Sequence, residues 1–490
     1  MIGCVRRTIA SPVTVIALLV ALAFGPAPAT ATPGDLDPTF STDGKAVTGF
    51  PEATVGYRTP ALLAVAPEGK SLMATTVNRC RKQKQCSRRA FFYKAQDLGV
   101  VRYTRDGQRD GSFSDDGRVI LTLPGTQSIA GVAVQEDGKT LLAGTSGNDI
   151  LLARLTRQGK LDRSFADAGL ATVDSGLVDQ GAGVEVRPDG GIVVAGSFGR
   201  GPDTPEGRNQ RDFVAAVFTP AGELDPSFSG DGIATVDFRP PESPEAESFA
   251  FASGMTLKAD GGVVIAGEVS ISNAQESESG LAIASLTADG QPDPAFGTSG
   301  EVVIGSALPP LGVAVDPFGS VVTATATGSF DTSTNFLISR FDRGGSLDPS
   351  FAGDGMALID GGGGEELTDA VTVQPDGSPV FTGSSDGARN SIDYALVRLT
   401  PQGEADPSFA EDGKLTVEFE GDYDDADGIE LQGDGRIVVA GTVGDQKIGI
   451  TRHEVAPGPP DFDADGIRDF EDRCPDRFGQ RRNGCPSRAG

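Results

Sequence analysis

The stretch Gly403-Glu-Ala-Asp406-Pro-Ser-Phe409-Ala-Glu-Asp412-Gly413 decides the fold, because close copies of it occur seven times along the 490 residues. The phenylalanines of these copies are Phe40, Phe113, Phe165, Phe228, Phe296, Phe351 and Phe409. Successive phenylalanines are 52 to 73 residues apart, which leaves room for one four-stranded unit and a loop of variable length. A repeat of this period indicates that most of the chain forms one body of similar units.

The stretch from Ser128 to Asp174 shows how one unit is built. It contains four short apolar runs, at 132–134, 141–144, 150–155 and 170–173, and turn residues separate them. Such runs predict antiparallel strands. A glycine lies between the first two runs of every repeat, and five of these glycines follow Asp, which favours a two-residue hairpin turn. The turn glycines are Gly69, Gly138, Gly190, Gly261, Gly319, Gly377 and Gly435.

This pattern predicts an all-β fold, a seven-bladed β-propeller of four-stranded antiparallel blades, in which each twisted sheet packs on two neighbours. The repeats begin with a lone strand, Lys45–Gly49, and end with three strands at 428–433, 436–443 and 447–453. We therefore expect the N-terminal strand to complete the last blade and close the ring. A linear solenoid or a stacked sandwich is the alternative.

The repeat resembles that of the bacterial delta-60 repeat proteins. The resemblance is carried by Leu396-Val-Arg-Leu-Thr-Pro-Gln-Gly403, Asp406-Pro-Ser-Phe409 and Val371-Thr-Val-Gln-Pro-Asp-Gly377, and it covers about residues 33 to 453. It implies an exported propeller and says almost nothing about function. The first blade departs from the pattern by inserting a loop that carries cysteines, and residues 162–168 have Arg163 in place of Pro.

The N-terminus predicts export. Arg6 and Arg7 precede an apolar stretch from Val13 to Phe24, and small residues follow up to Ala31. This order is typical of a secretory signal peptide, so we expect residues 1–31 to be removed near Ala31 and the mature protein to be secreted. No other run of about 18 apolar residues follows, which predicts no transmembrane segment. The expected domains are the propeller at 32–456 and a tail at 457–490.

Charge and composition exclude several kinds of function. The formal net charge of −28 argues against nucleic acid and anionic lipid as partners and favours cations. His453 is the single histidine, so a His-based triad or a His-rich metal site is excluded. The cysteines beyond the signal form two close pairs, Cys80 with Cys86 and Cys474 with Cys485, and in an exported chain they predict two local disulfides.

An aspartate occurs three residues before each repeated phenylalanine. Because it is present in every repeat, we interpret it as a turn cap and the phenylalanine as a core plug, with calcium or a cationic ligand as the alternative for the aspartates. These aspartates are Asp37, Asp110, Asp162, Asp225, Asp293, Asp348 and Asp406. The Asp-Gly turns and the Asp-Pro-Ser-Phe segments have nearly constant length, whereas the other two connections of each repeat vary in length. We expect these variable connections to share the face that binds a ligand.

A basic loop in the first repeat is a candidate binding site for a polyanion such as an acidic polysaccharide or an anionic wall polymer. Its cations stand out against the acidic chain. The alternative is a solvated loop that pairs with neighbouring acidic loops. The candidate residues are Arg79, Arg81, Lys82, Lys84, Arg88 and Arg89.

Two carboxylates interrupt strands that should be innermost, Glu185 in Val184-Glu-Val186 and Glu430 in Ile429-Glu-Leu431. The corresponding blades lie roughly opposite each other in a sevenfold ring, so both side chains are candidates for an acid and a base that act on a glycan in the central channel. The alternative is that Glu is simply tolerated where a channel is wet. We assign no other catalytic residue, and we interpret Asp422–Gly428 as an acidic loop.

The tail has the spacing of a calcium loop. Carboxylates at Asp461, Asp463, Asp465, Asp469 and Asp472 occupy positions 1, 3, 5, 9 and 12, with the carbonyl of Ile467 at position 7. Chance clustering of acidic residues is the alternative. The segment resembles a thrombospondin type 3 repeat, including Cys474-Pro475 and the later Asn483-Gly-Cys485-Pro. The expected cofactor is therefore Ca²⁺.

Three functions fit the sequence. The leading hypothesis is an exported, non-enzymatic propeller that binds an extracellular ligand such as a glycan, a cell-surface polymer or a protein. The second is a propeller enzyme that acts on extracellular glycan through Glu185 and Glu430. The third is a structural component of a surface or matrix.

Overall fold

The computed structural model describes most of the chain between Thr32 and Val455. The described ranges are 32–55, 59–79, 96–123, 125–200, 210–240, 243, 246–272, 277–305, 310–327, 334–361, 366–386, 391–419, 423–444 and 447–455. All of them belong to a unit that begins at Thr32. The expected signal peptide, most of the basic loop, the four cysteines that are expected to pair and the expected calcium-binding tail lie outside the described residues.

The described strands form four-stranded antiparallel units in chain order, and no helix occurs among the described residues. The strands of units 1 to 3 are β3 (Ala61–Val65), β4 (Ser71–Arg79), β5 (Gln96–Tyr103) and β6 (Arg118–Leu121); β7 (Gln127–Val134), β8 (Thr140–Ser146), β9 (Asp149–Leu155) and β10 (Leu170–Val173); and β11 (Gln180–Val186), β12 (Ile192–Gly199), β13 (Arg211–Phe218) and β14 (Ile233–Val236).

Units 4 to 7 repeat the arrangement. Their strands are β15 (Glu247–Leu257), β16 (Val263–Ser272), β17 (Ser277–Leu286) and β18 (Glu301–Gly305); β19 (Gly312–Val315), β20 (Val321–Thr327), β21 (Asn335–Phe341) and β22 (Met356–Ile359); β23 (Glu366–Val373), β24 (Pro379–Asp386), β25 (Ile392–Arg398) and β26 (Lys414–Val417); and β27 (Asp424–Leu431), β28 (Ile437–Val443) and β29 (Lys447–His453), with β1 (Lys45–Gly49) as the fourth strand.

Two details depart from simple four-stranded sheets. An additional short strand, β2 (Ala53–Val55), pairs with β4 in unit 1. Units 3 and 4 are joined into one eight-stranded sheet by a single pairing of Arg211 with Phe249. The all-β architecture expected from the sequence is confirmed, and four-stranded antiparallel sheets of this kind fit a β-propeller.

The strands predicted for 128–174 are all present, but the first turn differs from the expectation. In unit 2 the amide of Gln135 donates to the carbonyl of Lys139 at 2.9 Å, so the loop holds three residues. Gly138 has a φ of 75°, whereas Asp137 is not among the residues with positive φ. The two-residue turn would need positive φ at both central positions, so the observed turn is the three-residue type with a bulged glycine.

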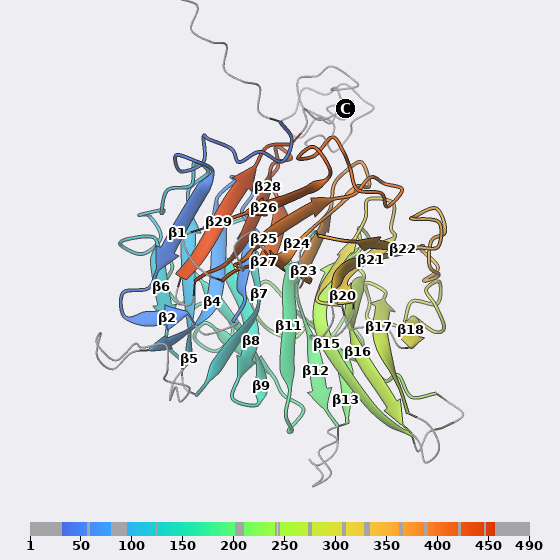
Figure 1. The fold of residues 1–490 in the computed structure, drawn as a ribbon. Helices are drawn as coiled ribbons and strands as arrows, with labels where there is room; N and C mark the ends of the chain where they lie inside the picture. The colour runs from blue at the N-terminus through green and yellow to red at the C-terminus, as the bar shows by residue number, and fades with distance from the viewer. Residues whose placement is uncertain are drawn as a thin grey trace, which may run out of the picture. The chain divides into compact units, whose positions relative to one another are not determined.

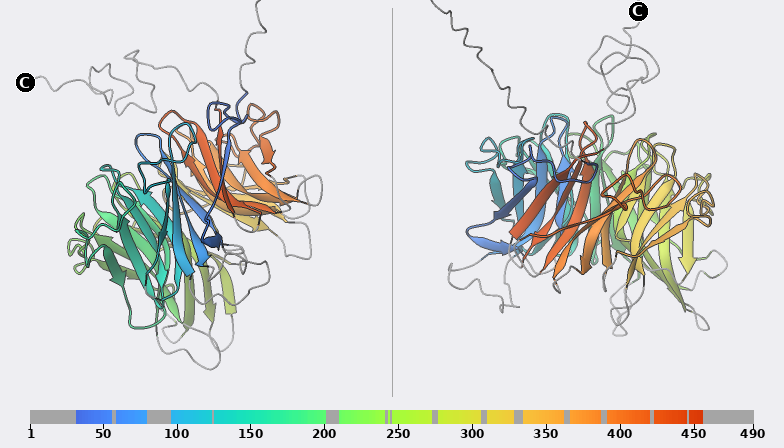
Figure 2. Two further views of the ribbon diagram at one scale, coloured as in Figure 1. Left: turned by 90° about the vertical axis from the view of Figure 1, so that its left-hand side faces the viewer. Right: turned by 45° about the horizontal axis from the view of Figure 1, so that its top comes forward.

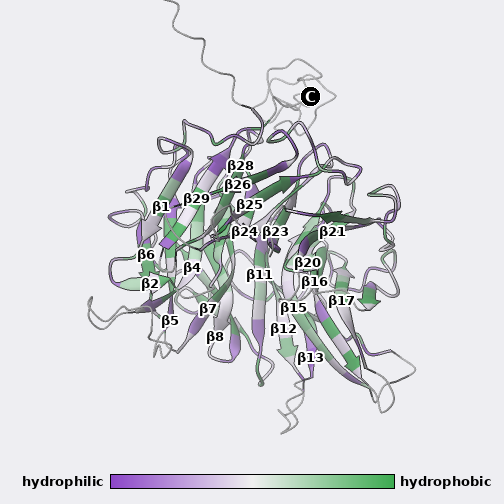
Figure 3. Ribbon diagram, viewed as in Figure 1, coloured by the Kyte–Doolittle hydropathy of each residue, from purple (hydrophilic) through white to green (hydrophobic). Residues whose placement is uncertain are grey.

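The core lies between neighbouring units. Figure 3 shows hydrophobic residues along the strands, and in β13 every residue is buried. One buried cluster joins Leu152 of unit 2 to Val194 of unit 3. Another joins Leu63 of unit 1 to Val438 of unit 7. Each sheet therefore has neighbours on both faces, which explains why its second and third strands are apolar without alternation.

The first strands of successive units lie against one another, and Figure 2 shows the sheets side by side in two further views. A Cβ atom on Gly131 of β7 would lie 2.6 Å from the backbone nitrogen of Val184 in β11. The same measurement on Gly428 of β27 gives 3.1 Å to Leu63 of β3. Glycine at these positions lets the first strands approach closely.

The N-terminal segment is built into unit 7. Strand β1 pairs with β29 through five residue pairs, and Figure 1 shows these two strands, blue and red, side by side. Upstream of β1, the amide of Gly34 donates to the carbonyl of Glu454 at 2.8 Å. The amide of Ala410 in unit 6 donates to the carbonyl of Pro33 at 2.8 Å. The segment thus supplies a turn as well as a strand.

Candidate functional site

A cavity of about 520 Å³ lies among the first strands. Residues of β3, β7, β11, β15, β19, β23 and β27, together with residues adjoining them, line it, so every unit contributes. Most lining residues are Gly, Ala, Val, Ile and Leu. The charged residues among the described lining residues are Glu185, Asp369, Asp427 and Glu430, and all four are acidic.

β-Bulges determine what the wall presents at one level of this cavity. In β7, β11, β15, β23 and β27 the pairing register shifts by one residue within the strand. The residue skipped at the bulge is Ala130, Ala182, Ser253, Asp369 and Asp427, respectively, and each of them lines the cavity. A bulge redirects a side chain and commonly does so beside a functional site. Units 6 and 7 therefore place carboxylates where the other three units place small residues.

The structure brings Glu185 and Glu430 to the same cavity, as the sequence predicted. Burial raises the pKa of Glu185 to about 7, although interactions with the backbone of Leu257 and the hydroxyl of Thr256 lower it. Burial and then the charge of Glu185 raise the pKa of Glu430 to about 8. Both side chains are partly accessible to solvent. The first strands of the units surround them, and this burial is the main cause of their raised pKa values. The charge of Glu185 therefore acts on Glu430 within the cavity.

The four carboxylates lie at two levels of the cavity. Glu185 and Glu430 form the first level, and Asp369 and Asp427, at the bulges, form the second. Burial and the charge of Asp425 hold the pKa of Asp369 well above its usual range. Burial, Asp425 and Asp369 do the same for Asp427. Asp427 Oδ2 accepts a hydrogen bond of 2.9 Å from the amide of Ala61, the first residue of β3. Asp369 Oδ2 is inaccessible and has no hydrogen-bond partner among the described residues.

Sequence reasoning missed this second level. It interpreted Asp422–Gly428 as a loop, whereas β27 begins at Asp424 and carries Asp425 and Asp427 within the strand. Acidic residues have low strand propensity, and the bulge that turns Asp427 into the cavity leaves no trace in the hydrophobic pattern. The matching Asp369 in unit 6 was a signal that could have revealed the pair.

The repeated aspartates serve the scaffold, which confirms their interpretation as turn caps. In unit 2 Asp162 Oδ1 accepts from the amide and hydroxyl of Ser164 at 3.1 and 2.6 Å. Asp162 Oδ2 accepts from Arg154 Nε at 2.9 Å, and the Arg154 guanidinium lies 4.2 Å from the ring centre of Phe165. The seven repeated phenylalanines are at most 3% exposed, as expected of core plugs.

The arginine in this arrangement was not predicted. It also joins neighbouring units, because Arg154 Nη1 donates to the carbonyl of Pro220 in unit 3 at 2.6 Å. Equivalent arginines on other third strands, each bonded to the aspartate of its unit, are Arg102, Arg340, Arg398 and Arg452. The signal was present, since four of these five arginines stand eight residues before their aspartates.

Units 3 and 4 obtain the same cation from a different strand. Val217 and Ser285 occupy the position of the arginine on their third strands. In unit 4, Lys258, which directly follows the first strand, approaches Asp293 at 2.7 Å. In unit 3, Arg187 holds the corresponding position and lies 5.3 Å from the ring centre of Phe228. A cation beside the aspartate is thus kept although its source changes.

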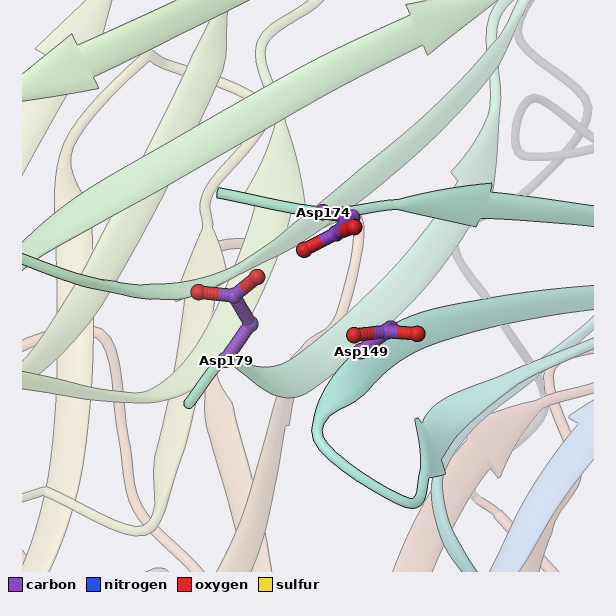
Figure 4. A group of neighbouring side chains, drawn as sticks. All are labelled: Asp149, Asp174 and Asp179. Carbon is purple, nitrogen blue, oxygen red and sulfur yellow. The ribbon is translucent and has the colours of Figure 1, made fainter. Parts of the chain in front are cut away.

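A separate acidic group lies near the junction of units 2 and 3. Asp149, Asp174 and Asp179 place carboxylate oxygens within 4.8 Å of one another, and Figure 4 shows the three side chains together. Asp179 is fully buried and accepts hydrogen bonds from Ser175 and from the amide of Gly199. Burial and then the charges of Asp174 and Asp179 raise the pKa of Asp149. The hydrogen bonds of Asp179 link the connection between β10 and β11 to the end of β12.

Other sequence-predicted residues are placed as follows. His453 is fully buried; its Nε2 lies 2.9 Å from Thr451 Oγ1 and its Nδ1 lies 2.9 Å from the Gly34 carbonyl. The side chains of Arg79, Arg81, Lys82, Lys84, Arg88 and Arg89, the two expected cysteine pairs and the expected calcium ligands from Asp461 to Asp472 lie outside the described residues. None of the described segments forms a helix long and apolar enough to span a bilayer.

Comparison with known proteins identifies the fold class. Residues 135–165, 258–296, 319–351 and 374–409 match the sequence model of a β-propeller domain of unknown function, DUF5122. These four matches fall on the copies of the repeat in units 2, 4, 5 and 6. The chain is therefore a β-propeller repeat protein. No curated protein matches its sequence.

Several solved structures are similar to this chain. A polysaccharide lyase of family PL25, an ulvan lyase, has 11% identity and a TM-score of 0.44, with 84% of this chain and 96% of that chain covered. A glucose dehydrogenase has 13% identity and a TM-score of 0.35, with 66% and 96% covered. A Bacteroides caccae protein of unknown function has 11% identity and a TM-score of 0.35, with 66% and 95% covered. No activity is carried over from structures at this distance.

Proposed function

We propose that this chain is an exported, non-enzymatic binding protein built on a closed seven-bladed β-propeller. Its ligand is held in the cavity among the first strands, which we call the axial cavity. The observation that carries the proposal is the cavity itself, to which every unit contributes a strand. Its volume of about 520 Å³ is within the range of ligand sites, roughly 300–1,000 Å³. Four carboxylates in a wall of small and apolar residues give it a few polar anchors, as binding sites have.

Closure of the ring is supported by contacts between unit 7 and unit 1 that repeat those between other units. Arg452 of unit 7 donates to the carbonyl of Arg105 in unit 1, as Arg154 does to Pro220. The amide of Ser41 donates to Asp106 at 2.7 Å, the counterpart of the Ser114 to Gln158 bond. A ring without free edges resists pairing with other chains.

Export and calcium binding complete the proposal. The basic and apolar order of residues 1–31 supports secretion. The oxygen spacing of Asp461, Asp463, Asp465, Ile467, Asp469 and Asp472 supports a Ca²⁺ loop, and Cys474 with Cys485 supports a disulfide beside it. The basic loop, with Cys80 and Cys86, adds a second candidate surface for an anionic polymer.

The test is a glycan array combined with a hydrolysis screen on the mature protein. Binding without turnover that is lost in Glu185→Gln supports a binding protein with its site in the cavity. Binding that is instead lost on replacing Arg79, Arg81, Lys82 and Lys84 with Ser moves the site to the basic loop. If no ligand responds to either set, the binding proposal fails and a structural component remains.

An enzyme acting on glycan is the second candidate, and one observation favours it. Burial raises the pKa of both glutamates toward neutral, to about 7 for Glu185 and about 8 for Glu430. A general acid works best with a pKa near the operating pH. Turnover that disappears in both Glu185→Gln and Glu430→Gln would establish this function in place of simple binding.

A further inference from the structure

We propose that the axial cavity selects a ligand that carries two or more primary ammonium groups, held by carboxylates at two levels. The inference rests on the proposed function, because it names the chemistry that the same cavity recognises. Linear polyamines and oligomers of glucosamine share this chemistry. The matching carboxylates are Glu185 and Glu430 at one level and Asp369 and Asp427 at the other.

The first step is the sign of the charge. Lys, Arg and His are absent from the described residues that line the cavity, whereas four acidic side chains are present. In the scaffold the opposite holds, since the repeated aspartates are paired with an arginine or lysine, as Asp162 with Arg154 and Asp293 with Lys258. The chain therefore supplies cations where it needs them for packing and leaves the cavity acidic. Buried charges in proteins are normally paired, and burial raises the pKa of all four carboxylates, so they ionise fully only when a cation from outside pairs with them.

The second step is the unsatisfied oxygen. Asp369 lies at a bulge that turns it into the cavity wall, and its Oδ2 has no hydrogen-bond partner among the described residues. A buried polar atom without a partner is rare in a folded protein and is expensive to keep. The other bulge carboxylate, Asp427, already accepts hydrogen bonds from the backbone of Ala61 and of Thr442. Asp369 is therefore the carboxylate of this pair that lacks a donor, and an ammonium group bound beside it would supply one.

The third step is the spacing, which favours separate ammonium groups over one metal ion. Among the described residues, the carboxylate group that meets the distance criterion for a shared metal is Asp149, Asp174 and Asp179, outside the cavity. Glu430 follows Asp427 by three residues on the same strand, so the two levels are about 10 Å apart at roughly 3.3 Å per residue. Two cationic groups joined by a short aliphatic or sugar linker fit that separation better than a single ion.

The experiment is isothermal titration calorimetry on the mature protein in buffer that contains about 10 mM calcium, roughly ten times or more the dissociation constant expected for the tail, so that the tail is in one state. The probes are spermidine, the glucosamine trimer and the N-acetylglucosamine trimer. The N-acetylated sugar keeps the shape of the trimer and lacks the ammonium groups. Binding of spermidine and glucosamine trimer with no binding of the acetylated trimer is the expected result.

Matched variants locate the site. Asp369→Asn and Glu185→Gln each remove one charge with little change of shape, one at each level, and each should weaken the binding about tenfold or more, as loss of a charge-assisted contact does. Asp386→Asn removes the same charge from an exposed position at the end of β24 outside the lining and should leave affinity unchanged. Melting temperatures of the variants show that each is folded.

The outcomes separate this inference from the proposed function. Failure of both ammonium probes to bind, or equal affinity of Asp386→Asn, Asp369→Asn and Glu185→Gln, overturns the inference. If the acetylated trimer binds and Glu185→Gln abolishes that binding, the cavity is a ligand site but its selectivity for ammonium is wrong. If titration with calcium chloride alone displaces spermidine one for one, the cavity holds a metal ion and the inference is likewise wrong.

Discussion

Arg452 donates from Nε to Asp37 Oδ2 at 2.7 Å, and this buried pair joins residues 415 positions apart in the chain. Both side chains are at most 4% exposed, and the Arg452 guanidinium lies 4.9 Å from the ring centre of Phe40. Every other unit obtains its aspartate and phenylalanine from its own continuous segment. Unit 7 alone of the described units assembles them from the two ends of the chain, so the last unit depends on long-range contacts.

The first prediction concerns this assembly. Deleting residues 32–50 removes β1, Asp37 and Phe40 together, leaving the edge of β29 unpaired and Arg452 buried without its anion. The melting temperature should fall clearly, with aggregation through the open edge. Differential scanning calorimetry with light scattering measures both effects. An unchanged melting temperature and a monodisperse variant would contradict ring closure.

The second prediction concerns the third-strand arginines that form hydrogen bonds to the neighbouring unit. Arg154→Ala leaves Asp162 buried with Lys139 as its remaining cation and removes the bond to Pro220. Because Lys139 still compensates the charge of Asp162, the loss is that of hydrogen bonds to a charged group, about 1.5–3 kcal/mol, and a drop in the urea midpoint is expected. Arg163→Ala, at an exposed position close by, is the control and should change stability by less than about 0.5 kcal/mol. If both variants lose similar amounts of stability, the contacts of Arg154 with Asp162 and Pro220 do not stabilise the fold.

The third prediction is that the protein loses stability in acid because of His453, which lies in unit 7 beside the N-terminal segment. Burial lowers the pKa of His453 from 6.5 to about 4 in the folded protein. The unfolded chain therefore binds this proton more readily, and the contribution of His453 is present above pH 6.5 and lost as the pH falls toward 4. The shift of about 2.5 units corresponds to on the order of 3 kcal/mol. Urea denaturation at pH 4.5 and pH 7.5 measures it.

The control for this prediction is His453→Leu, because unit 2 and unit 6 carry Leu155 and Leu399 at the equivalent place. The variant loses the hydrogen bond to Gly34 at every pH, and its stability should depend less on pH between 6.5 and 4. If wild type and variant lose the same free energy of unfolding over that range, His453 is not the group responsible.

The fourth prediction concerns alkaline pH and the cavity. Folding raises the pKa of Glu185 to about 7 and that of Glu430 to about 8, from 4.5. Their contribution to stability is therefore complete below pH 4.5 and is lost as the pH rises through 7 and 8. Glu430→Gln cannot ionise and should be more stable than wild type at pH 9, by at least about 1 kcal/mol, the equivalent of one pKa unit. At pH 4 the two proteins should unfold alike, and an advantage equal at both pH values would contradict this account.

The fifth prediction concerns the calcium tail. Five aspartates between Asp461 and Asp472 repel one another without metal, so Ca²⁺ should order the tail with a dissociation constant of about 0.1–1 mM. Asp465→Ala should remove most of this binding and leave the melting of the propeller unchanged. Calorimetry and circular dichroism on residues 456–490 give the measurement. No heat of binding and no ordering at millimolar calcium would refute the site.

The sequence was most informative where a single residue type performs one task in every repeat. The turn glycines all have positive φ and the repeated phenylalanines are all buried, because each position has one local solution that the chain repeats. Glu185 and Glu430 were also found in advance, since they replace Ala or Thr of other units on an otherwise regular strand.

The missed features depend on register and on contacts between strands. Asp427 enters the cavity because a bulge skips it in the pairing with β28, and a skipped residue reverses which face the preceding side chains occupy. Nothing in the local sequence marks that change. Arg187 and Lys258 replace third-strand arginines from another strand, so the charge is kept in space and lost from the alignment of repeats.

The pairing of β1 with β29 has a consequence for biosynthesis. Residues that complete the last sheet are made first, and their partner strand is made about 400 residues later. At 5–20 residues per second the ribosome needs roughly 20–80 s for that interval. During this time six units can form in order, whereas β1 has no partner strand until β29 is made. Pairing of the first-made strand with the last-made strand is therefore the last step of folding, and the completion of synthesis sets when the last sheet can form.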